Sequence, residues 1–427
     1  MQNNTLSRAD LSNETGVAKD VHYGDVLIKF GEVLDISKEK LPMITDEKVL
    51  TKYKTSFLQN GDVVVADTAE DTTVGKCSEI AELNDEVVIS GLHTIPYRPV
   101  EKFATGYLGY YLNSDSYHNQ LIPLMQGIKV TSISKSAMQD TNIIYPNSKE
   151  EQAKIGKYFI TLDNLITLHQ RKLDHVKDLK KSMLQKMFPK NGQLYPEVRF
   201  PEFTDAWEQR KLGEISDKVT KKNQDVVVDE VFTNSAEYGI ISQRDFFDKD
   251  IANTENIDGY YVVEPNDFVY NPRISTTAPF GPIKRNKLER SGAMSPLYYV
   301  FRPNNVDLSY LEWFFQTSCW YPFMRFNGNS GARSDRFAIT DKIFNEMPIS
   351  LPQDIEEQKR IGMFLTTLDT LITLHQRKLG AINLTNAIVL FDNGYNPALA
   401  CELIILKGVL TYAKHHYQKQ HVILRLL

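Results

Sequence analysis

Apolar residues recur at alternating spacings of four and three along a polar stretch in the middle of the chain. This stretch begins near Ser148 and is stopped by Pro189 and Gly192. Such a heptad stripe is typical of a helix that packs lengthwise against another helix. About forty residues at about 1.5 Å each predict a rod of roughly 60 Å. The stripe residues are Ile155, Phe159, Leu162, Ile166, Leu173, Val176, Met183 and Met187.

The same pattern occurs a second time near the C-terminus. The run TLDNLITLHQRKL spans residues 161–173, and TLDTLITLHQRKL spans residues 367–379, which lie 206 positions later. Only Asn164 and Thr370 differ between the two runs. A duplication on this scale has to be interpreted before any local motif. The chain therefore consists of two copies of one plan.

Because both helices present the same apolar stripe, we expect them to pair in antiparallel orientation. His169 and His375 also lie on this stripe, where a role in setting the register is favoured over a ligand or pH switch. Each helix start has the spacing of a capping box, Ser148 with Glu151 and Asp354 with Glu357. The residues expected to hold the helices together are Leu162, Ile166, Leu173, Leu368, Ile372 and Leu379.

Before each helix the pattern changes to short apolar runs bounded by Gly, Pro, Asn and Asp, which predict strands joined by turns. The clearest runs are residues 62–66, 86–90, 259–263 and 297–301. The two stretches share landmarks, namely Gly61-Asp62 with Asn266-Asp267 and Tyr97-Arg98-Pro99 with Phe301-Arg302-Pro303. Each also has a short aromatic helix, with Tyr107, Leu108, Tyr110 and Tyr111 or with Tyr310, Leu311, Trp313 and Phe314. The predicted fold is thus α/β (α+β) with an internal pseudo-two-fold repeat.

The predicted organisation has six parts. These are a first domain at 1–147, a spacer helix at 148–190, a connector at 191–211, a second domain at 212–353, the start of a second spacer helix at 354–379, and a divergent tail at 380–427. The helices are nearly identical and the domains differ. If the domains recognise a target and the helices hold the domains at a fixed distance, then that target has two parts at a fixed separation.

The composition of the chain restricts the cellular compartment and the kind of partner that we expect. The chain has a net charge of -5, no apolar run of membrane-spanning length and no export signal at its N-terminus. Three scattered cysteines form no disulfide framework, so we expect a reducing cytoplasm. The negative net charge argues against nucleic-acid binding by bulk charge, but local basic loops remain.

Two loops of the second domain are rich in cations and small polar residues, a composition that suits contact with phosphates and base edges. A loop of the first domain after Gly127 corresponds to the second of them. For any single cation a solvated surface charge is the better interpretation, whereas for the loops together DNA contact is favoured. The candidate DNA-binding residues are Lys129, Arg273, Lys284, Arg285, Arg333 and Arg336.

Signals for catalysis are weak by comparison. The sequence has no phosphate-binding loop ending in Lys-Ser/Thr, no HExxH and no GxSxG, so we predict no catalytic residues. The run Asn271-Pro272-Arg273 is not the NPPY loop of adenine methyltransferases. His415, His416 and His421 lie in the tail without a second ligand pair, so we predict no metal site.

Taken together, the chain resembles the specificity subunit of type I restriction-modification systems over about residues 8–379. Two divergent domains each precede a near-identical helix, and each helix begins with the pattern EEQxxIGxxxxxLDxLITLHQRKL. The connector YPEVRFPEFTDAWEQRKLGEI, residues 195–215, resembles the opening of a recognition domain in that family. Alternatives are a coiled-coil scaffold that binds proteins or glycans and, least supported, a nuclease acting alone.

The resemblance implies two target-recognition domains separated by two long antiparallel coiled-coil helices. Each domain is expected to read one half of a split site in double-stranded DNA, and the helices to fix the gap. Modification subunits, which use S-adenosylmethionine, and ATP-driven restriction subunits are the expected partners. The subunit itself is then non-catalytic and has no cofactor, because S-adenosylmethionine, ATP and Mg would belong to the partners.

The sequence departs from the family pattern at both ends. The segment PEVRFPEF...W...KLGEI is missing before the first domain, so that domain is expected to lack its opening strand. After Leu379 the repeat breaks, and Gly380, Asn383 and Asn386 are poor helix formers. A truncated or silent recombination copy of a specificity subunit is therefore an alternative.

Overall fold

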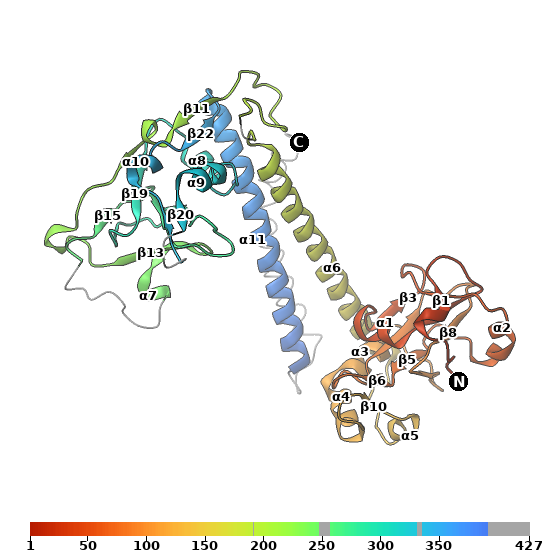
Figure 1. The fold of residues 1–427 in the computed structure, drawn as a ribbon. Coiled ribbons are helices and arrows are strands. Elements are labelled where there is room, and N and C mark those ends of the chain that lie inside the picture. The colour runs from red at the N-terminus through yellow and green to blue at the C-terminus, as the bar shows by residue number, and fades with distance from the viewer. Residues whose placement is uncertain (191, 247–256, 331–334, 392–427) are drawn as a thin grey trace. The chain divides into compact units, whose positions relative to one another are not determined.

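The computed structural model describes residues 1–190, 192–246, 257–330 and 335–391 of the chain (Figure 1). It divides into two compact units, which are described separately. One unit comprises residues 1–169 with the described residues from 378 to 391, and the other comprises the described residues of 170–377. Each unit contains a mixed helix and strand domain, which confirms the predicted fold class.

The first domain is built on two four-stranded sheets. One has the order β1-β4-β2-β8, and its strands are β1 (Leu11–Ser12), β4 (Met43–Ile44), β2 (Ala18–Val21) and β8 (Val88–Ser90). The other has the order β3-β7-β5-β9, with β3 (Val33–Asp35), β7 (Cys77–Ala81), β5 (Val63–Ala66) and β9 (Thr94–Tyr97). A ribbon of β6 (Thr68–Ala69) and β10 (Thr131–Ser132) and five helices complete it. The helices are α1 (Tyr23–Ile28), α2 (Lys48–Lys52), α3 (Tyr107–Asn113), α4 (Asp115–Leu121) and α5 (Lys135–Met138).

The second domain repeats this plan. One sheet has the order β14-β13-β18-β15, with β14 (Gly239–Ser242), β13 (Val231–Ser235), β18 (Gly292–Met294) and β15 (Tyr261–Val263). The other has the order β12-β19-β16-β17, with β12 (Ser216–Lys218), β19 (Tyr299–Pro303), β16 (Phe268–Tyr270) and β17 (Ile283–Arg285). Smaller pairs are β11 (Glu208–Lys211) with β22 (Pro348–Leu351) and β20 (Asn329–Ser330) with β21 (Phe337–Ala338). Its helices are α7 (Gln243–Phe246), α8 (Leu308–Phe314), α9 (Tyr321–Asn327) and α10 (Asp341–Phe344).

The landmarks shared by the two halves of the sequence form one salt bridge in each domain. Arg98 donates two hydrogen bonds to Asp62, at 2.8 and 2.7 Å. Arg302 donates the same two bonds to Asp267, at 2.7 and 3.0 Å. Both carboxylates are buried, so bidentate pairing compensates for the desolvation of their charge. The bridge ties the start of β5 or β16 to the end of β9 or β19.

The junction between domain and long helix is also repeated in detail. Gln152 accepts a hydrogen bond from the Ala104 amide at 3.1 Å, and Gln358 accepts one from the Asp307 amide at 2.9 Å. Both glutamine amides donate in turn to the carbonyl of the proline six residues earlier. One turn later, Gly156 lets the helix approach the domain, because a Cβ there would lie 2.6 Å from the Thr105 carbonyl oxygen. Each helix is thereby fixed rigidly to its own domain.

The long helices are α6 (Lys149–Lys186) and α11 (Ile355–Phe391). In the second unit, the C-terminal half of α6 lies beside α11, and Lys180 pairs with Asp369 (Figure 1). Further along α6, the Lys186 carbonyl accepts from Val198, and neighbouring Phe200 contacts Phe364. The partner residue number therefore falls as α6 advances, which confirms the antiparallel orientation.

The predicted pairing residues are mostly buried. Leu162, Leu173, Leu368 and Leu379 are buried, whereas Ile166 and Ile372 are half-buried. Leu368 belongs to a buried cluster against which four apolar residues of α6 in the same unit pack, namely Val176, Leu179, Met183 and Leu184. The pairing role of the remaining residues stays a prediction.

Two details of the long helices differ from the sequence prediction. α11 continues past Leu379 to Phe391. Gly380 costs about 1 kcal/mol of helix stability and each asparagine costs less, and such single penalties do not stop an established helix from propagating. Glu357 does not cap its helix. Its carboxylate binds Arg199 at 2.7 and 2.8 Å and Trp207 at 3.3 Å. The residues from 392 onward lie outside the described part of the chain.

A buried carboxyl group makes the stability of the first domain pH-dependent. Burial raises the pKa of Asp20 to about 7, although the side-chain amide of Asn4 donates a hydrogen bond to this carboxylate at 2.5 Å. Since this folded-state pKa lies above the unfolded value near 4, the folded state binds more protons between about pH 4 and pH 7. We expect the domain to lose about 2–4 kcal/mol of stability as pH rises through that window.

The variant Asp20→Asn should flatten this dependence, since an amide does not titrate. Thermal unfolding followed by circular dichroism at pH 5 and pH 8 measures the effect. Asp85→Asn, at an exposed position of the same domain, is the matched control. An equal pH dependence in wild type and Asp20→Asn would contradict the assignment.

Candidate nucleic-acid interface

Each domain brings together two loops that are far apart in the sequence. In the first domain β6 pairs with β10, with Thr131 opposite Ala69. In the second domain Arg273 and Arg336 form an isolated antiparallel bridge. Hydrogen bonds from Ile274 to Asp335 and from Phe337 to Pro272 flank that bridge, at 3.0 and 2.8 Å. In the second domain, two loops that the sequence marked separately therefore form one surface, and the first domain has an equivalent pair of loops.

The loop of Arg273 is shaped by the turn at the end of β16. The side chain of Asn271 accepts from the Arg273 amide at 3.0 Å and donates to the Asn234 carbonyl at 2.8 Å. Gly281 has φ +84°, and a Cβ there would lie 2.0 Å from the Asn271 carbonyl oxygen. Only glycine closes this loop without strain. The base of the loop is thus rigid, and the backbone that carries the exposed Arg273 side chain is held in place.

Arg273 and Arg336 are both exposed, and their backbones are neighbours. Within the described residues neither guanidinium has a carboxylate at ion-pair distance. Two unneutralised arginines side by side repel one another, and an anionic ligand would relieve that repulsion. Bidentate donors of this kind suit phosphate oxygens or the edge of guanine. Arg333 lies outside the described residues.

The helix that leads into this loop adds two residues. Arg325 on α9 is exposed, with its guanidinium 5.9 Å from the Phe280 ring centroid. Phe326 beside it is 89% exposed, whereas Met324 is fully buried. Sequence reasoning missed Phe326, although its position off the buried face of the helix was a usable signal. An exposed aromatic ring next to cations is suited to packing on a nucleic-acid surface.

Lys284 and Arg285 do not belong to this surface. They lie on β17, where Arg285 is opposite Phe268 and therefore away from the end of the hairpin that carries the loop. Arg285 binds Asn266 and approaches Glu312 at 3.8 Å. Burial lowers the pKa of Lys284, and Glu312 opposes that effect. Their predicted DNA contact remains untested, and the geometry favours a structural charge network.

Two other cations of the same basic stretch are bound to acids. Arg290 donates to Glu230 at 2.6 and 2.8 Å. Arg302 forms the salt bridge with Asp267 described above. The density of cations along the sequence therefore overstated the free positive charge.

The matching surface of the first domain carries less charge. Gln126 and Ser132 exchange two backbone hydrogen bonds, at 2.9 and 2.8 Å, and close a hairpin around Gly127, whose φ is +114°. Lys129 is exposed at the tip, between the exposed Ile128 and Val130. The neighbouring loop offers exposed Glu70 and Asp71 instead of arginines. The two domains thus present the same loops with different chemistry.

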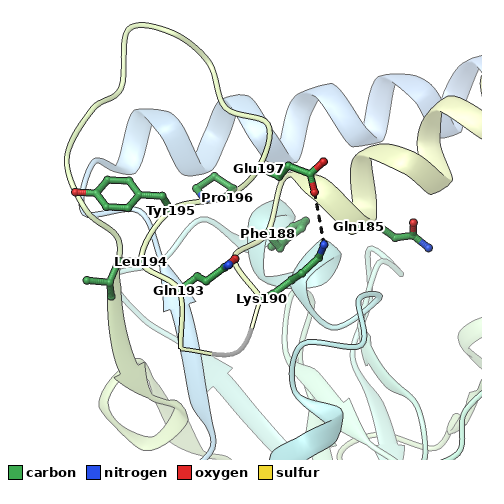
Figure 2. A pocket seen from close by; sticks show the side chains of 8 residues that line it. All are labelled: Gln185, Phe188, Lys190, Gln193, Leu194, Tyr195, Pro196 and Glu197. Atoms are coloured by element: carbon green, nitrogen blue, oxygen red, sulfur yellow. Dashed lines mark hydrogen bonds and ion pairs between the residues drawn. The ribbon is translucent and has the colours of Figure 1, made fainter.

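A cavity of about 400 Å³ lies where the chain leaves α6 (Figure 2). Lys190 and Glu197, which both line the cavity, form an ion pair at 3.5 Å that Figure 2 marks with a dashed line. Glu197 also pairs with Lys186 at 3.2 Å. These contacts fasten the connector loop to the helix, and the residues that line the cavity include no serine, cysteine or histidine.

Within the described part of the chain, no group of three or more metal-binding side chains gathers. His415, His416 and His421 lie outside the described residues. None of the described helices is sufficiently long and apolar to span a bilayer.

Comparison with known proteins assigns these domains to a family. A family described as type I restriction modification DNA specificity domain matches residues 20–178 and again residues 204–384. A Methanocaldococcus jannaschii protein assigned as the MjaX type I restriction enzyme specificity subunit is 24% identical over 369 residues, covering 82% of this chain and 79% of the relative. The type I restriction-modification S subunit from M. genitalium shares the fold, with a TM-score of 0.51 at 12% identity over 91% of each chain. Since the family matches most of the chain in two consecutive copies, this protein belongs to the type I restriction modification DNA specificity family.

Proposed function

We propose that this chain is the DNA-reading subunit of a type I restriction-modification complex and binds a split site in double-stranded DNA. The observation that carries the proposal is the duplication. Two domains with one fold differ in the loops that they present, while the junctions and helices behind them are nearly the same. Each domain would read one half-site, and the helices would set the gap between the halves.

The chemistry of the loops supports reading of DNA. Arg273 and Arg336 present unneutralised donors from a rigid base, and Lys129 occupies the matching hairpin of the first domain. Contacts to phosphate set the position of a protein on DNA, and contacts to base edges select the sequence. A helix of 38 residues is about 57 Å long. That length is of the order of one to two turns of duplex, which suits two half-sites on one face.

In this proposal the subunit is non-catalytic and binds no cofactor. Its partners would be modification subunits, which transfer a methyl group from S-adenosylmethionine, and ATP-driven restriction subunits, which require Mg. The role of this chain would be to hold those partners at the site that its domains select. Its location would then be the cytoplasm, where the DNA lies.

Exchange of one domain tests the proposal. Residues 212–353 would be replaced by the second domain of another family member, and the hybrid co-expressed with the genomically adjacent modification subunit. Methylation mapping of the host DNA should show one half of the motif changed and the other retained, with the same gap. A change in both halves, or methylation at contiguous sites, would sink the proposal.

Arg273→Ala and Arg336→Ala test the loop surface. If either arginine reads a base, its loss should cost about 1–3 kcal/mol and relax specificity at one position. If it contacts phosphate, binding should weaken for all sequences alike, and the salt dependence should become shallower by about one unit of slope. Fluorescence anisotropy with the assembled complex at several salt concentrations distinguishes these cases.

Arg210→Ala, at a half-buried arginine on β11 that pairs with Glu208 and Glu214, is the control away from this surface. It should leave affinity and salt slope unchanged. Wild-type binding by Arg273→Ala and Arg336→Ala at every salt concentration would remove this surface from the interface.

A further inference from the structure

The tip of one hairpin in the first domain is both apolar and cationic. Ile128 is 101% exposed and Val130 is 54% exposed, and the exposed Lys129 lies between them. A single exposed apolar residue is ordinary on a protein surface. Two of them beside a cation at the end of one loop suit a partner that offers an apolar surface next to negative charge.

The base of this hairpin is fixed. A Cβ on Gly127 would lie 2.0 Å from the Val130 carbonyl oxygen, so the backbone is tightly closed just below the tip. The Ile133 amide donates to the Asp67 carbonyl at 2.9 Å, and the Ile133 side chain is buried in the core of the domain. Ile128 is therefore presented on a preorganised loop, and a ligand that covers it does not have to order the backbone first.

The hairpin occupies the place in the first domain that the loop of Arg336 occupies in the second. Each loop leads into a short helix, and the residue before that helix caps it in the same way. Ser134 accepts from the Ala137 amide at 3.1 Å, and Thr340 accepts from the Ile343 amide at 3.4 Å. The loop surface of the second domain is cationic, whereas that of the first domain ends in an apolar tip.

Double-stranded DNA combines the two properties that this tip suits, because the apolar faces of its base pairs lie between two anionic backbones. Aliphatic side chains cannot hydrogen-bond to base edges, but proteins that deform DNA insert them between neighbouring base pairs. Glu70 and Asp71 are exposed directly after β6, beside the hairpin, and their charge opposes contact along a phosphate backbone. These features favour entry of the tip into a groove.

Given that these loops face DNA, as the proposed function requires, we propose that Ile128 is a wedge that the first domain inserts between neighbouring base pairs of its half-site. Val130 packs beside the wedge, and Lys129 compensates the charge of the flanking phosphates. Unstacking a base step costs a free energy comparable to that recovered by burying one aliphatic side chain. The wedge therefore selects steps that unstack easily, namely a pyrimidine followed by a purine.

Bending of DNA by the assembled complex is the first test. The probe is a duplex that carries the mapped methylation motif, with a fluorescence donor at one end and an acceptor at the other. Wild type should raise the energy transfer. Ile128→Ser should lose most of that rise and bind about tenfold more weakly, whereas Ile128→Leu should retain both because it keeps the apolar volume.

Unstacking at the wedge step is the second test. 2-Aminopurine, which fluoresces more strongly when unstacked, replaces each base of the first half-site in turn except the methylated adenine. Wild type should raise the fluorescence at one pyrimidine–purine step, and Ile128→Ser should not. Replacing that step by two adenines should weaken binding by wild type and leave Ile128→Ser unchanged.

Val100→Ser is the matched control, because Val100 is 103% exposed in the same domain. It follows β9, whose last residue Tyr97 lies opposite Val63 at the start of β5, whereas β6 follows the end of β5. This variant should bind and bend DNA as wild type does. Both valine and isoleucine sites are at the surface, so the serine variants should fold normally.

The outcomes separate this inference from the proposed function. Binding of the split site by wild type, with the same bend and affinity in Ile128→Ser, would overturn the wedge and leave the proposed function standing. Failure of wild type to bind any split site would overturn both. Gel filtration of the assembled complex excludes another occupant, since loss of the modification subunit from Ile128→Ser would mean that the tip contacts that protein instead of DNA.

Discussion

Leu365→Asp will unfold the second unit at denaturant concentrations that leave the wild type intact. Leu365 is fully buried in a cluster that joins α11, the C-terminal part of α6 and the second domain. The substitution buries a carboxylate among apolar side chains and also leaves a cavity. We expect a loss of about 4 kcal/mol or more.

The positions of the tryptophans make a fluorescence measurement specific for the second unit. Trp207, Trp313 and Trp320 are the three tryptophans of the chain, and all lie within residues 170–377. Tryptophan fluorescence in a urea titration therefore follows the second unit alone. Met363→Asp places the same charge two residues away on α11 at a position that is 65% exposed, and should change stability by about 0.5 kcal/mol or less. Equal losses in both variants would mean that charge on the helix, not burial, is responsible.

Glu357→Ala should destabilise the second unit by about 3–5 kcal/mol. It removes one partner of a buried ion pair and leaves the Arg199 guanidinium without its bidentate acceptor. The Trp207 indole loses its acceptor at the same time. The same urea titration measures the loss.

The repeat supplies an internal control at the matching position of the first copy. Glu151→Ala changes the equivalent residue, which is exposed and has no arginine beside it within the described residues. We expect an effect of about 0.5 kcal/mol or less on the isolated chain. A large effect of Glu151→Ala, or a small effect of Glu357→Ala, would contradict the contrast between an exposed carboxylate and a buried carboxylate that is paired with an arginine.

Periodicity was sufficient to predict the long helices and their antiparallel pairing. The stripe around Leu368 had to be buried along its length, and only a second helix with the same stripe could cover it. The repeat also predicted which positions are structurally equivalent. Arg98 and Arg302 matched in the sequence, as did Asp62 and Asp267, and each arginine binds the aspartate of its own domain. These features are local or duplicated, so one sequence contains enough information to find them.

Partner choice among charges could not be predicted in the same way. Arg302 and Arg273 look alike in the sequence, yet one is bound to a buried aspartate and the other is exposed on a loop. Glu357 has the spacing of a helix cap, but the connector brings Arg199 to it from 158 residues away. Such pairings depend on tertiary contacts, which outweigh local preferences of about 1 kcal/mol.

The repeated junction makes each recognition domain an exchangeable cassette. Gln152 and Gln358 bind their own domains in the same way, and the runs at 161–173 and 367–379 differ at one position. A crossover between two such chains anywhere within that run would transfer a complete domain and leave the helix surface unchanged. New half-site combinations could thus arise in single steps, without intermediates that fail to fold.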